Sequence, residues 1–251
     1  MPPKMVIRYI SGMNASLALA DLKAFTKKGR ISDLARFYKT GPGEYAEGDL
    51  FLGGTVPQTR SVAKKYQNLD LKEVEKLFAS PFHEARLCAA IILNHQLSKA
   101  RTPQERKRIF DFYLKQVRAE RVNNWDIVDV SAPWMGVYLT EIEDPMPLLI
   151  KLSKSKSLWQ RRVSIILTFA LIRAGDLEPT ITIAELLLKD EQDLIHKAVG
   201  WMLREAGKRD VMLLRRFLVE HSHEMPRTML RYAIEKLPER ERKQWLLESK
   251  S

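Results

Sequence analysis

Apolar residues recur at three- and four-residue spacing along almost the whole chain, and alternating apolar and polar runs are nearly absent. This periodicity is typical of amphipathic helices and predicts an all-α fold. The main interruption is "GPGEYAEGDLFLGG" at 41–54, which holds five of the 11 glycines and predicts a long loop. Residues 1–12 lack the amphipathic pattern that starts at Met13. We interpret them as a poorly ordered extension, or as residues ahead of the native start, before a single domain at 13–251.

From about residue 70 the helical pattern repeats itself. Four segments share one order, a short amphipathic helix, a polar break and a longer helix, and they span 74–93, 148–169, 183–203 and 213–234. A basic residue opens each longer helix, namely Arg86, Arg162, Lys197 and Arg227. Their separations of 76, 35 and 30 residues leave room for one more repeat, at 104–139. Helix pairs repeated at this interval predict an α-solenoid of the HEAT or armadillo kind, with about six pairs and a concave surface.

Amino-acid composition and net charge indicate which kinds of molecule the protein binds. The 251 residues include 42 Lys and Arg against 31 Asp and Glu, a formal net charge of +11. Such an excess is typical of proteins that bind nucleic acid, although membrane surfaces and acidic proteins also fit. No apolar run approaches the ~20 residues that a membrane span needs. The single cysteine, Cys88, excludes an intramolecular disulfide and fits a reducing cytoplasm.

The basic residues that open the longer helices are predicted to follow the concave surface and form a groove. A groove of this kind suits the phosphate backbone of duplex DNA, whose contacts give affinity without reading the bases. One predicted turn between helices gathers further cations, namely Lys154, Lys156, Arg161 and Arg162. A solvated rim is the simpler interpretation of any single cation, but four at equivalent positions favour the groove.

Motifs for several enzyme classes are missing from the sequence. The five histidines do not combine with Cys88 or with one another at a metal-ligand spacing. No P-loop, dinucleotide-binding glycine pattern or Gly-x-Ser-x-Gly motif is present. The acidic residues are mostly scattered over predicted helix surfaces rather than clustered as metal ligands.

The segment "NNWDIVDVSAP" at 123–133 departs from the basic pattern. Asn123 or Asn124 is a favourable N-cap, and a helix starting there carries Trp125 and Asp129 one turn apart on one face. Asp126 lies in the first turn, and we interpret its presence there as explained by the helix macrodipole alone. Asp129 takes the place that other repeats give to a cation. Core packing for Trp125 and a salt bridge for Asp129 are the alternative interpretations.

A second indole lies on a predicted basic stripe, formed by Lys197, Trp201, Arg204 and Lys208 at spacings of 4, 3 and 4. An indole face and a carboxylate both stabilise positive charge. Both therefore suit hydrolysis of an N-glycosidic bond, whose transition state has oxocarbenium character. If alkylation has already made the departing base cationic, no general acid is needed, and one carboxylate is enough to stabilise the sugar and orient water.

Four segments together resemble the DNA alkylation repair proteins of the AlkD type: "TGPGEYAEGDLFLGGTVPQTRSVAKKY", "NNWDIVDVSAP", "SLWQRRVSIILTF" and "LIHKAVGWMLREAGKRD". The similarity runs from about Met13 to Leu247. The family comprises HEAT-like-repeat glycosylases of base excision repair, which release N3- and N7-alkylated purines. The resemblance implies cleft roles for Trp125 and Trp201, a catalytic role for Asp129, and DNA contact by Arg162 or its neighbour Arg161.

The resemblance further implies that the lesion stays stacked in the duplex, that no cofactor or metal takes part, and that an abasic site is the product. We therefore expect a cytoplasmic, nucleoid-associated monomer that binds duplex DNA with alkylated bases and no membrane. The full set of predicted DNA-binding residues is Lys154, Lys156, Arg86, Arg161, Arg162, Lys197, Arg204, Lys208 and Arg227. The alternative from another class is a non-catalytic helical-repeat scaffold that binds nucleic acid or an acidic protein.

Overall fold

A computed structural model describes residues 12–248, so the predicted extension lies, except for Gly12, outside the described residues. Within this range the chain forms fourteen α-helices and one 3-10 helix, and its only β-type pairing is an isolated bridge between Leu50 and Phe82. The all-α prediction is confirmed. Among the described helices none is long and apolar enough to cross a membrane.

The chain divides into two compact units, 1–131 and 132–251, and α7 (Trp125–Met135) contains the boundary. The helices of the first unit that precede it are α1 (Ala15–Ala24), α2 (Lys28–Phe37), α3 (Val56–Lys65), α4 (Leu71–Phe78), α5 (His83–Lys99) and α6 (Pro103–Arg118). The second unit contains η2 (Gly136–Glu141), α8 (Met146–Ser153), α9 (Leu158–Ala174), α10 (Glu178–Leu186), α11 (Asp193–Gly207), α12 (Val211–His221), α13 (Arg227–Ala233) and α14 (Glu239–Glu248).

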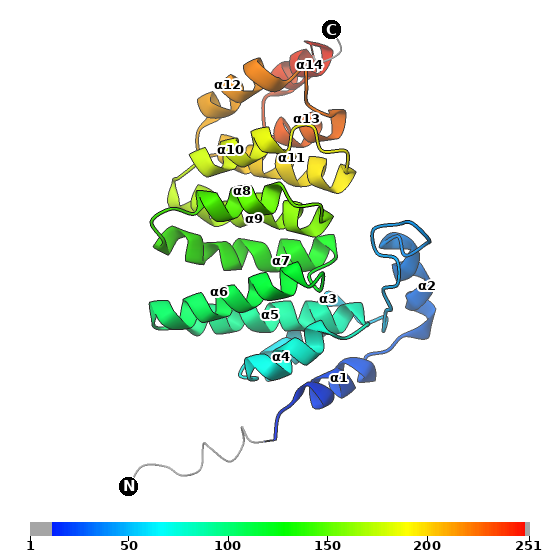
Figure 1. Cartoon of the computed structure of the whole chain (residues 1–251). Coiled ribbons are helices and arrows are strands. Elements are labelled where there is room, and N and C mark those ends of the chain that lie inside the picture. The colour runs from blue at the N-terminus through cyan, green and yellow to red at the C-terminus, as the bar shows by residue number, and fades with distance from the viewer. Residues whose placement is uncertain (1–11, 249–251) are drawn as a thin grey trace. The chain divides into compact units, whose positions relative to one another are not determined.

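Successive helix pairs stack within each unit, as expected for HEAT-like repeats. In the second unit α9, α11 and α13 pack side by side, while α8 and α10 form a second layer against α9 and α11 (Figure 1). In the first unit α3 and α4 pack on α5, and α6 packs on both α4 and α5. The predicted additional repeat is present as the pair α6 and α7.

The predicted order of a short helix followed by a longer one is confirmed for three pairs, α4 with α5, α8 with α9 and α10 with α11. It is wrong for the last pair, because α12 has 11 residues and α13 has seven. The longer helices α5 and α9 are buried along most of their length, since neighbouring helices cover them on several sides.

Local sequence signals explain several of these boundaries. Thr102 and Glu105 form a capping box at the start of α6, with Pro103 at the first helical position. At Gly200 the reason for glycine is the close approach of α11 and α13. A Cβ there would lie 2.4 Å from the Met229 carbonyl oxygen and 2.5 Å from the Cβ of Tyr232.

The predicted long loop lies between α2 and α3, and its aromatic residues fold inward. Tyr38, Ala46 and Phe51 form a small apolar cluster against which Trp125 packs. The Glu84 carboxylate holds the far end of the loop by accepting hydrogen bonds from the backbone N–H groups of Leu52, at 2.9 Å, and Gly53, at 2.8 Å. Helix α2, which has no buried residue of its own, is thus attached to the rest of the first unit largely through this loop.

Candidate functional site

Helix α7 begins where the sequence predicts. Asn124 precedes the helix, its carbonyl accepts the first intrahelical hydrogen bond from the N–H of Val128, and its side-chain oxygen accepts one from the N–H of Trp125 at 2.8 Å. Farther along, the Asn94 amide of α5 donates to the Val130 carbonyl at 2.8 Å. Both ends of this segment of α7 are therefore held by buried amide side chains.

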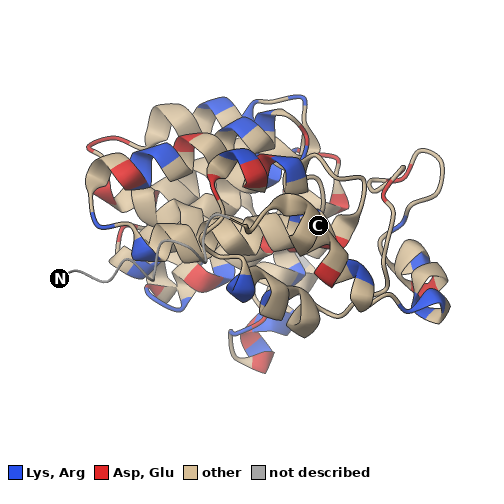
Figure 2. Ribbon diagram, turned by 90° about the horizontal axis from the view of Figure 1, so that it is seen from below, with Lys and Arg blue, Asp and Glu red and all other residues tan. Residues whose placement is uncertain are grey.

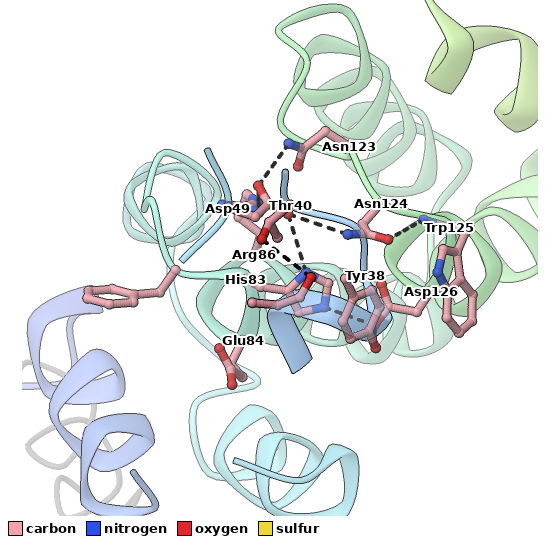
Figure 3. A network of polar contacts seen from close by, with 12 residues as sticks. Tyr38, Thr40, Asp49, His83, Glu84, Arg86, Asn123, Asn124, Trp125 and Asp126 are labelled. Carbon is pink, nitrogen blue, oxygen red and sulfur yellow. Dashed lines mark hydrogen bonds and ion pairs between the residues drawn. The ribbon is translucent and has the colours of Figure 1, made fainter. Parts of the chain in front are cut away.

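The Trp125 indole is half-buried and belongs to an aromatic stack (Figure 3). Its ring lies 5.6 Å from that of Tyr38 with an interplanar angle of 23°, and Tyr38 stacks in turn on Phe51 at 5.1 Å. Phe37, which is 63% exposed, meets the indole edge-on at 6.0 Å. The core-packing interpretation of Trp125 thus accounts for one face of the indole, and Phe37 adds an exposed aromatic ring beside it.

Asp126 is not explained by the helix macrodipole alone, and that interpretation is wrong. Its Oδ2 accepts a hydrogen bond from the Tyr38 hydroxyl at 2.9 Å and one from His83 Nε2 at 2.9 Å. The pKa of Tyr38 is raised well above its usual value, first by burial and then by the charge of Asp126. Asp126 is therefore part of a side-chain network that links the residue after α2 to α5 and α7.

His83 is the centre of this network and is 2% exposed (Figure 3). Its Nδ1 lies 3.7 Å from Asp49 Oδ2, an ion-pair rather than a hydrogen-bond distance. Burial lowers the pKa of His83, but Asp126 and Asp49 outweigh it and raise the pKa to about 9. Burial likewise acts to raise the pKa of Asp49, and His83 and Arg86 outweigh it, so that pKa lies below its usual value. The network thus holds a protonated imidazole between two carboxylates.

Arg86 was predicted to lie on the surface of a groove, and this is wrong. The residue is 5% exposed, its guanidinium lies 2.6 Å from Asp49 Oδ1, and it donates to the Ser80 carbonyl at 3.0 Å. The folded loop that carries Asp49 supplies a carboxylate that compensates the buried charge. Arg86 is therefore buried inside the first unit with its charge compensated by Asp49.

Asp129 is the fifth residue of α7 and lies half-buried, one helical turn beyond Trp125. Its charge adds to burial in raising the pKa of Tyr113, a fully buried residue whose hydroxyl lies 3.1 Å from Ser131 Oγ. The Asp129 carboxylate is therefore near enough to the Tyr113 hydroxyl to act on it electrostatically.

In the second unit, Arg162 is also the fifth residue of its helix, but it is 4% exposed and donates to the Leu194 carbonyl at the start of α11. The surface expectation is wrong for Arg162 as well, because its guanidinium is used to join α9 to α11. Arg161 lies 2.5 Å from the Asp190 carboxylate and donates to the Ser155 and Lys156 carbonyls. Each guanidinium therefore has an intramolecular structural partner.

The basic stripe on α11 is present as the least buried face of that helix. Lys197, Trp201 and Arg204 are half-buried and Lys208 is exposed, whereas Ala198, Val199, Met202 and Leu203 are buried. Each cation has an acidic neighbour. Lys197 pairs with Asp193 at 2.7 Å, Lys208 with Glu205 at 2.8 Å, and Arg204 with Glu205 and Glu235. Basic and acidic residues are intermixed along the ribbon elsewhere as well (Figure 2).

The remaining predicted cations are exposed. Lys154 and Lys156 lie in the turn between α8 and α9, and Arg227 is the first residue of α13. Arg227 donates to the Leu246 carbonyl at 2.6 Å. Since Lys197 is the fifth residue of α11, Arg227 is not at the equivalent position of its own helix, and Arg231 is. The predicted equivalence of the four cations therefore fails at α13.

The structure thus brings Trp125 together with Asp129 in the first unit, and Trp201 together with Lys197, Arg204 and Lys208 in the second. Sequence reasoning missed Tyr38, Asp49 and His83, because it tested the histidines only as metal ligands. The available signal was the loop motif "GEYAEGD", in which an aspartate follows two glycines and a tyrosine. Among the described residues no three His, Cys, Asp or Glu side chains group as a metal site.

Comparison with known proteins connects this geometry to a family. The family model described as DNA alkylation repair enzyme matches residues 18–237. Two solved structures share the fold, each at 16% sequence identity. One is a predicted DNA alkylation repair enzyme from Enterococcus faecalis, with a TM-score of 0.67, covering 85% of this chain and 97% of its own. The other represents "a new family of proteins related to the HEAT-like repeat DNA glycosylases with affinity for branched DNA structures", with a TM-score of 0.54, covering 84% and 83%.

A search of curated proteins gave no match. The two structures, at this identity, support the HEAT-like fold, while the family model covers most of the sequence. Because the family model matches residues 18–237, which include the Trp125 and Asp129 pair at the start of α7, the chain belongs to the DNA alkylation repair enzyme family.

Proposed function

We propose that this protein is a monofunctional DNA glycosylase that hydrolyses the N-glycosidic bond of cationic N3- and N7-alkylated purines in duplex DNA. The observation that carries the proposal is the pairing of Trp125 and Asp129 one turn apart on α7, in a chain of this family. An indole and a carboxylate in this register suit a reaction that develops positive charge on the sugar.

The reaction begins when the bond between C1′ of the deoxyribose and the purine nitrogen breaks. The electron pair leaves with the base, which departs neutral because alkylation had made it cationic. The sugar is left as an oxocarbenium ion, and the Asp129 carboxylate stabilises this ion. The same carboxylate orients a water molecule beside the ion. The water adds to C1′ and releases a proton, which leaves an abasic site. Since the base needs no protonation, one carboxylate is enough.

Asp129 is better suited to this role than Asp126, although both lie in the first two turns of α7. Asp126 accepts hydrogen bonds from Tyr38 and His83, so its charge is balanced inside the protein. Asp129 shares the helix face of Trp125, because the two are four residues apart. A carboxylate on that face would stabilise the positive charge that forms on the sugar beside the indole.

DNA contacts are proposed for the cations whose side chains are exposed or half-buried, and Arg86 and Arg162 are left out of this set. The set comprises Lys154, Lys156, Arg161, Lys197, Arg204, Lys208 and Arg227. Trp201 is proposed to contact the deoxyribose, by its match to the family motif. Contacts of this kind act on phosphate and sugar and carry little base specificity.

The decisive test incubates duplex DNA containing 7-methylguanine with wild type and with Asp129→Asn, and measures released base. Wild type should release it, and Asp129→Asn should lose at least 100-fold in rate, on the order of the loss when one group that stabilises transition-state charge is removed. Asp111→Asn, on the exposed surface of α6, is the matched control. Undiminished release by Asp129→Asn would remove Asp129 from the mechanism.

Absence of base release by wild type, with retained DNA affinity, would favour the alternative of a non-catalytic DNA-binding scaffold. One structural relative represents a family with affinity for branched DNA structures, which gives that outcome a concrete follow-up. Competition between linear and four-way junction DNA for the wild-type protein would then measure whether the scaffold prefers branched substrates.

A further inference from the structure

Three segments that lie far apart in the sequence meet at the first turn of α7. They are the loop residues around Asp49, the start of α5 with His83 and Arg86, and the helix start at Asn124–Asp126 (Figure 3). Burying four charged groups in one place is costly unless their geometry compensates each charge. An apolar cluster would stabilise this place as well, so stability alone does not account for the charged arrangement.

Hydrogen-bond geometry defines the state of the central imidazole. Nε2 must donate to Asp126 Oδ2, which is 2.9 Å away, because an ionised carboxylate only accepts. Nδ1 faces a second carboxylate, that of Asp49, at 3.7 Å. A lone pair there would be repelled by Asp49, whereas an N–H is attracted. The positive charge of His83 therefore balances Asp126 from one side, while Arg86 balances Asp49 from the other.

Asp126 connects this charge balance to the aromatic stack. Its Oδ2 also accepts the Tyr38 hydroxyl at 2.9 Å, and the Tyr38 ring covers one face of Trp125. Displacing Asp126 would release the Tyr38 hydroxyl, and with it the ring on which the indole rests. It would also leave an uncompensated carboxylate three residues from Asp129, within the distance at which like charges on a helix repel.

A cavity lies beside the network, but ligand binding in this cavity is not a better explanation of the buried charges. It has a volume of about 280 Å³ and is lined by Tyr38, His83, Glu84 and Asp126 among others. Its polar lining is engaged within the protein, since Glu84 accepts from the Leu52 and Gly53 amides and Arg30 donates to the Gly53 carbonyl. The network therefore acts on the protein's own elements.

We propose that His83 is a positioning residue, which through Asp126 and Tyr38 sets the orientation of the Trp125 indole and the electrostatic surroundings of Asp129. This role rests on the proposed glycosylase function but is carried by a different residue and a different contact. His83 touches neither DNA nor the sugar. Its contribution is the placement of the residues that do.

The test labels the protein with 5-fluorotryptophan and records ¹⁹F NMR spectra, in which Trp125→Phe identifies the Trp125 resonance among those of the five tryptophans. His83→Gln keeps a donor but removes the charge, and Asp126→Asn carries the same test if His83→Gln does not fold. The matched control is His95→Gln, farther along α5. We expect the Trp125 resonance to move in His83→Gln and to stay in place in His95→Gln.

The second readout separates positioning from mere stability. With folded enzyme in excess over 7-methylguanine duplex, the single-turnover rate constant of His83→Gln should fall by about 10- to 100-fold, as expected for a small misplacement of reacting groups. DNA affinity should be unchanged. An unmoved Trp125 resonance, or a moved resonance with an unaltered rate constant, would overturn the proposal. If wild type released no base, the proposed function would fail, while the resonance would still decide whether His83 positions Trp125.

Discussion

The state of His83 makes a quantitative prediction about stability and pH. Burial opposes the charge of the imidazole, but Asp126 and Asp49 raise its pKa to about 9 in the folded protein. The groups that face it are Tyr38, which directly follows α2, Asp49 from the loop, Arg86 from α5 and Asp126 from α7, and Glu84 lines the same cavity. In the unfolded chain its pKa returns to about 6.5. The folded state therefore binds one proton more than the unfolded state between these two values.

The sign and size follow from this difference. A histidine whose pKa is raised by folding contributes stability that is fully present below pH ~6.5 and is lost as pH rises through about 9. Each pKa unit corresponds to about 1.4 kcal/mol, so the 6.5-to-9 interval corresponds to roughly 3 kcal/mol. Within this window the free energy of unfolding should fall with a slope of up to about 1.4 kcal/mol per pH unit.

The assay is urea unfolding followed by far-ultraviolet circular dichroism at several pH values from 6 to 9.5, for wild type and His83→Gln. The difference between the two proteins cancels other titrating groups. It should shrink by roughly 3 kcal/mol across the window. His95→Gln is the matched control, because burial lowers the pKa of His95 and its contribution changes only below pH ~6.5, so its difference from wild type should stay constant from pH 6.5 to 9. A difference between wild type and His83→Gln that stays constant from pH 6.5 to 9 would refute the protonated imidazole.

Three further predictions test the second unit, the proposed DNA contacts and the core. Gly200→Ala should destabilise the protein by about 1–3 kcal/mol through overpacking against α13. Gly29→Ala, whose added Cβ would have no atom within 4 Å, should leave stability unchanged or raise it by up to ~1 kcal/mol. Thermal unfolding of both variants measures the two changes. Lys197→Ala and Arg227→Ala should each weaken DNA binding regardless of sequence and flatten its salt dependence by up to about one unit. Unchanged slopes in a filter-binding series at several salt concentrations would remove both residues from the interface. Cys88, whose pKa burial raises to about 12, should react with a thiol reagent at pH 8 only after denaturation.

Much of the fold could be predicted from the sequence because the buried face of a helix recurs every three or four residues along the chain. The three- and four-residue periodicity predicted the helix pairs, and the polar residue before an apolar run predicted the start of α7 at Asn124. The relation between Trp125 and Asp129 also needed only local information, since four residues make about one helical turn. The departure at α12 and α13 came from assuming that every pair repeats the same lengths.

Charge placement was the part that local spacing did not determine. Arg86 and Arg162 lie in the first two turns of their helices, yet both are buried, because Asp49 and the Leu194 carbonyl compensate them from segments more than 30 residues away. Whether a cation faces solvent or a partner depends on which distant loop folds over it.

By itself, then, the sequence determined the helical-repeat fold, the family and the carboxylate that shares a helix face with an indole. The tertiary structure alone decided that Asp126 is balanced by His83, that Tyr38 supports Trp125, and that two of the predicted DNA-binding arginines are structural. The physical reason is that helix periodicity is a property of neighbours along the chain, whereas the energy of a buried charge is determined by whichever groups the fold brings beside it.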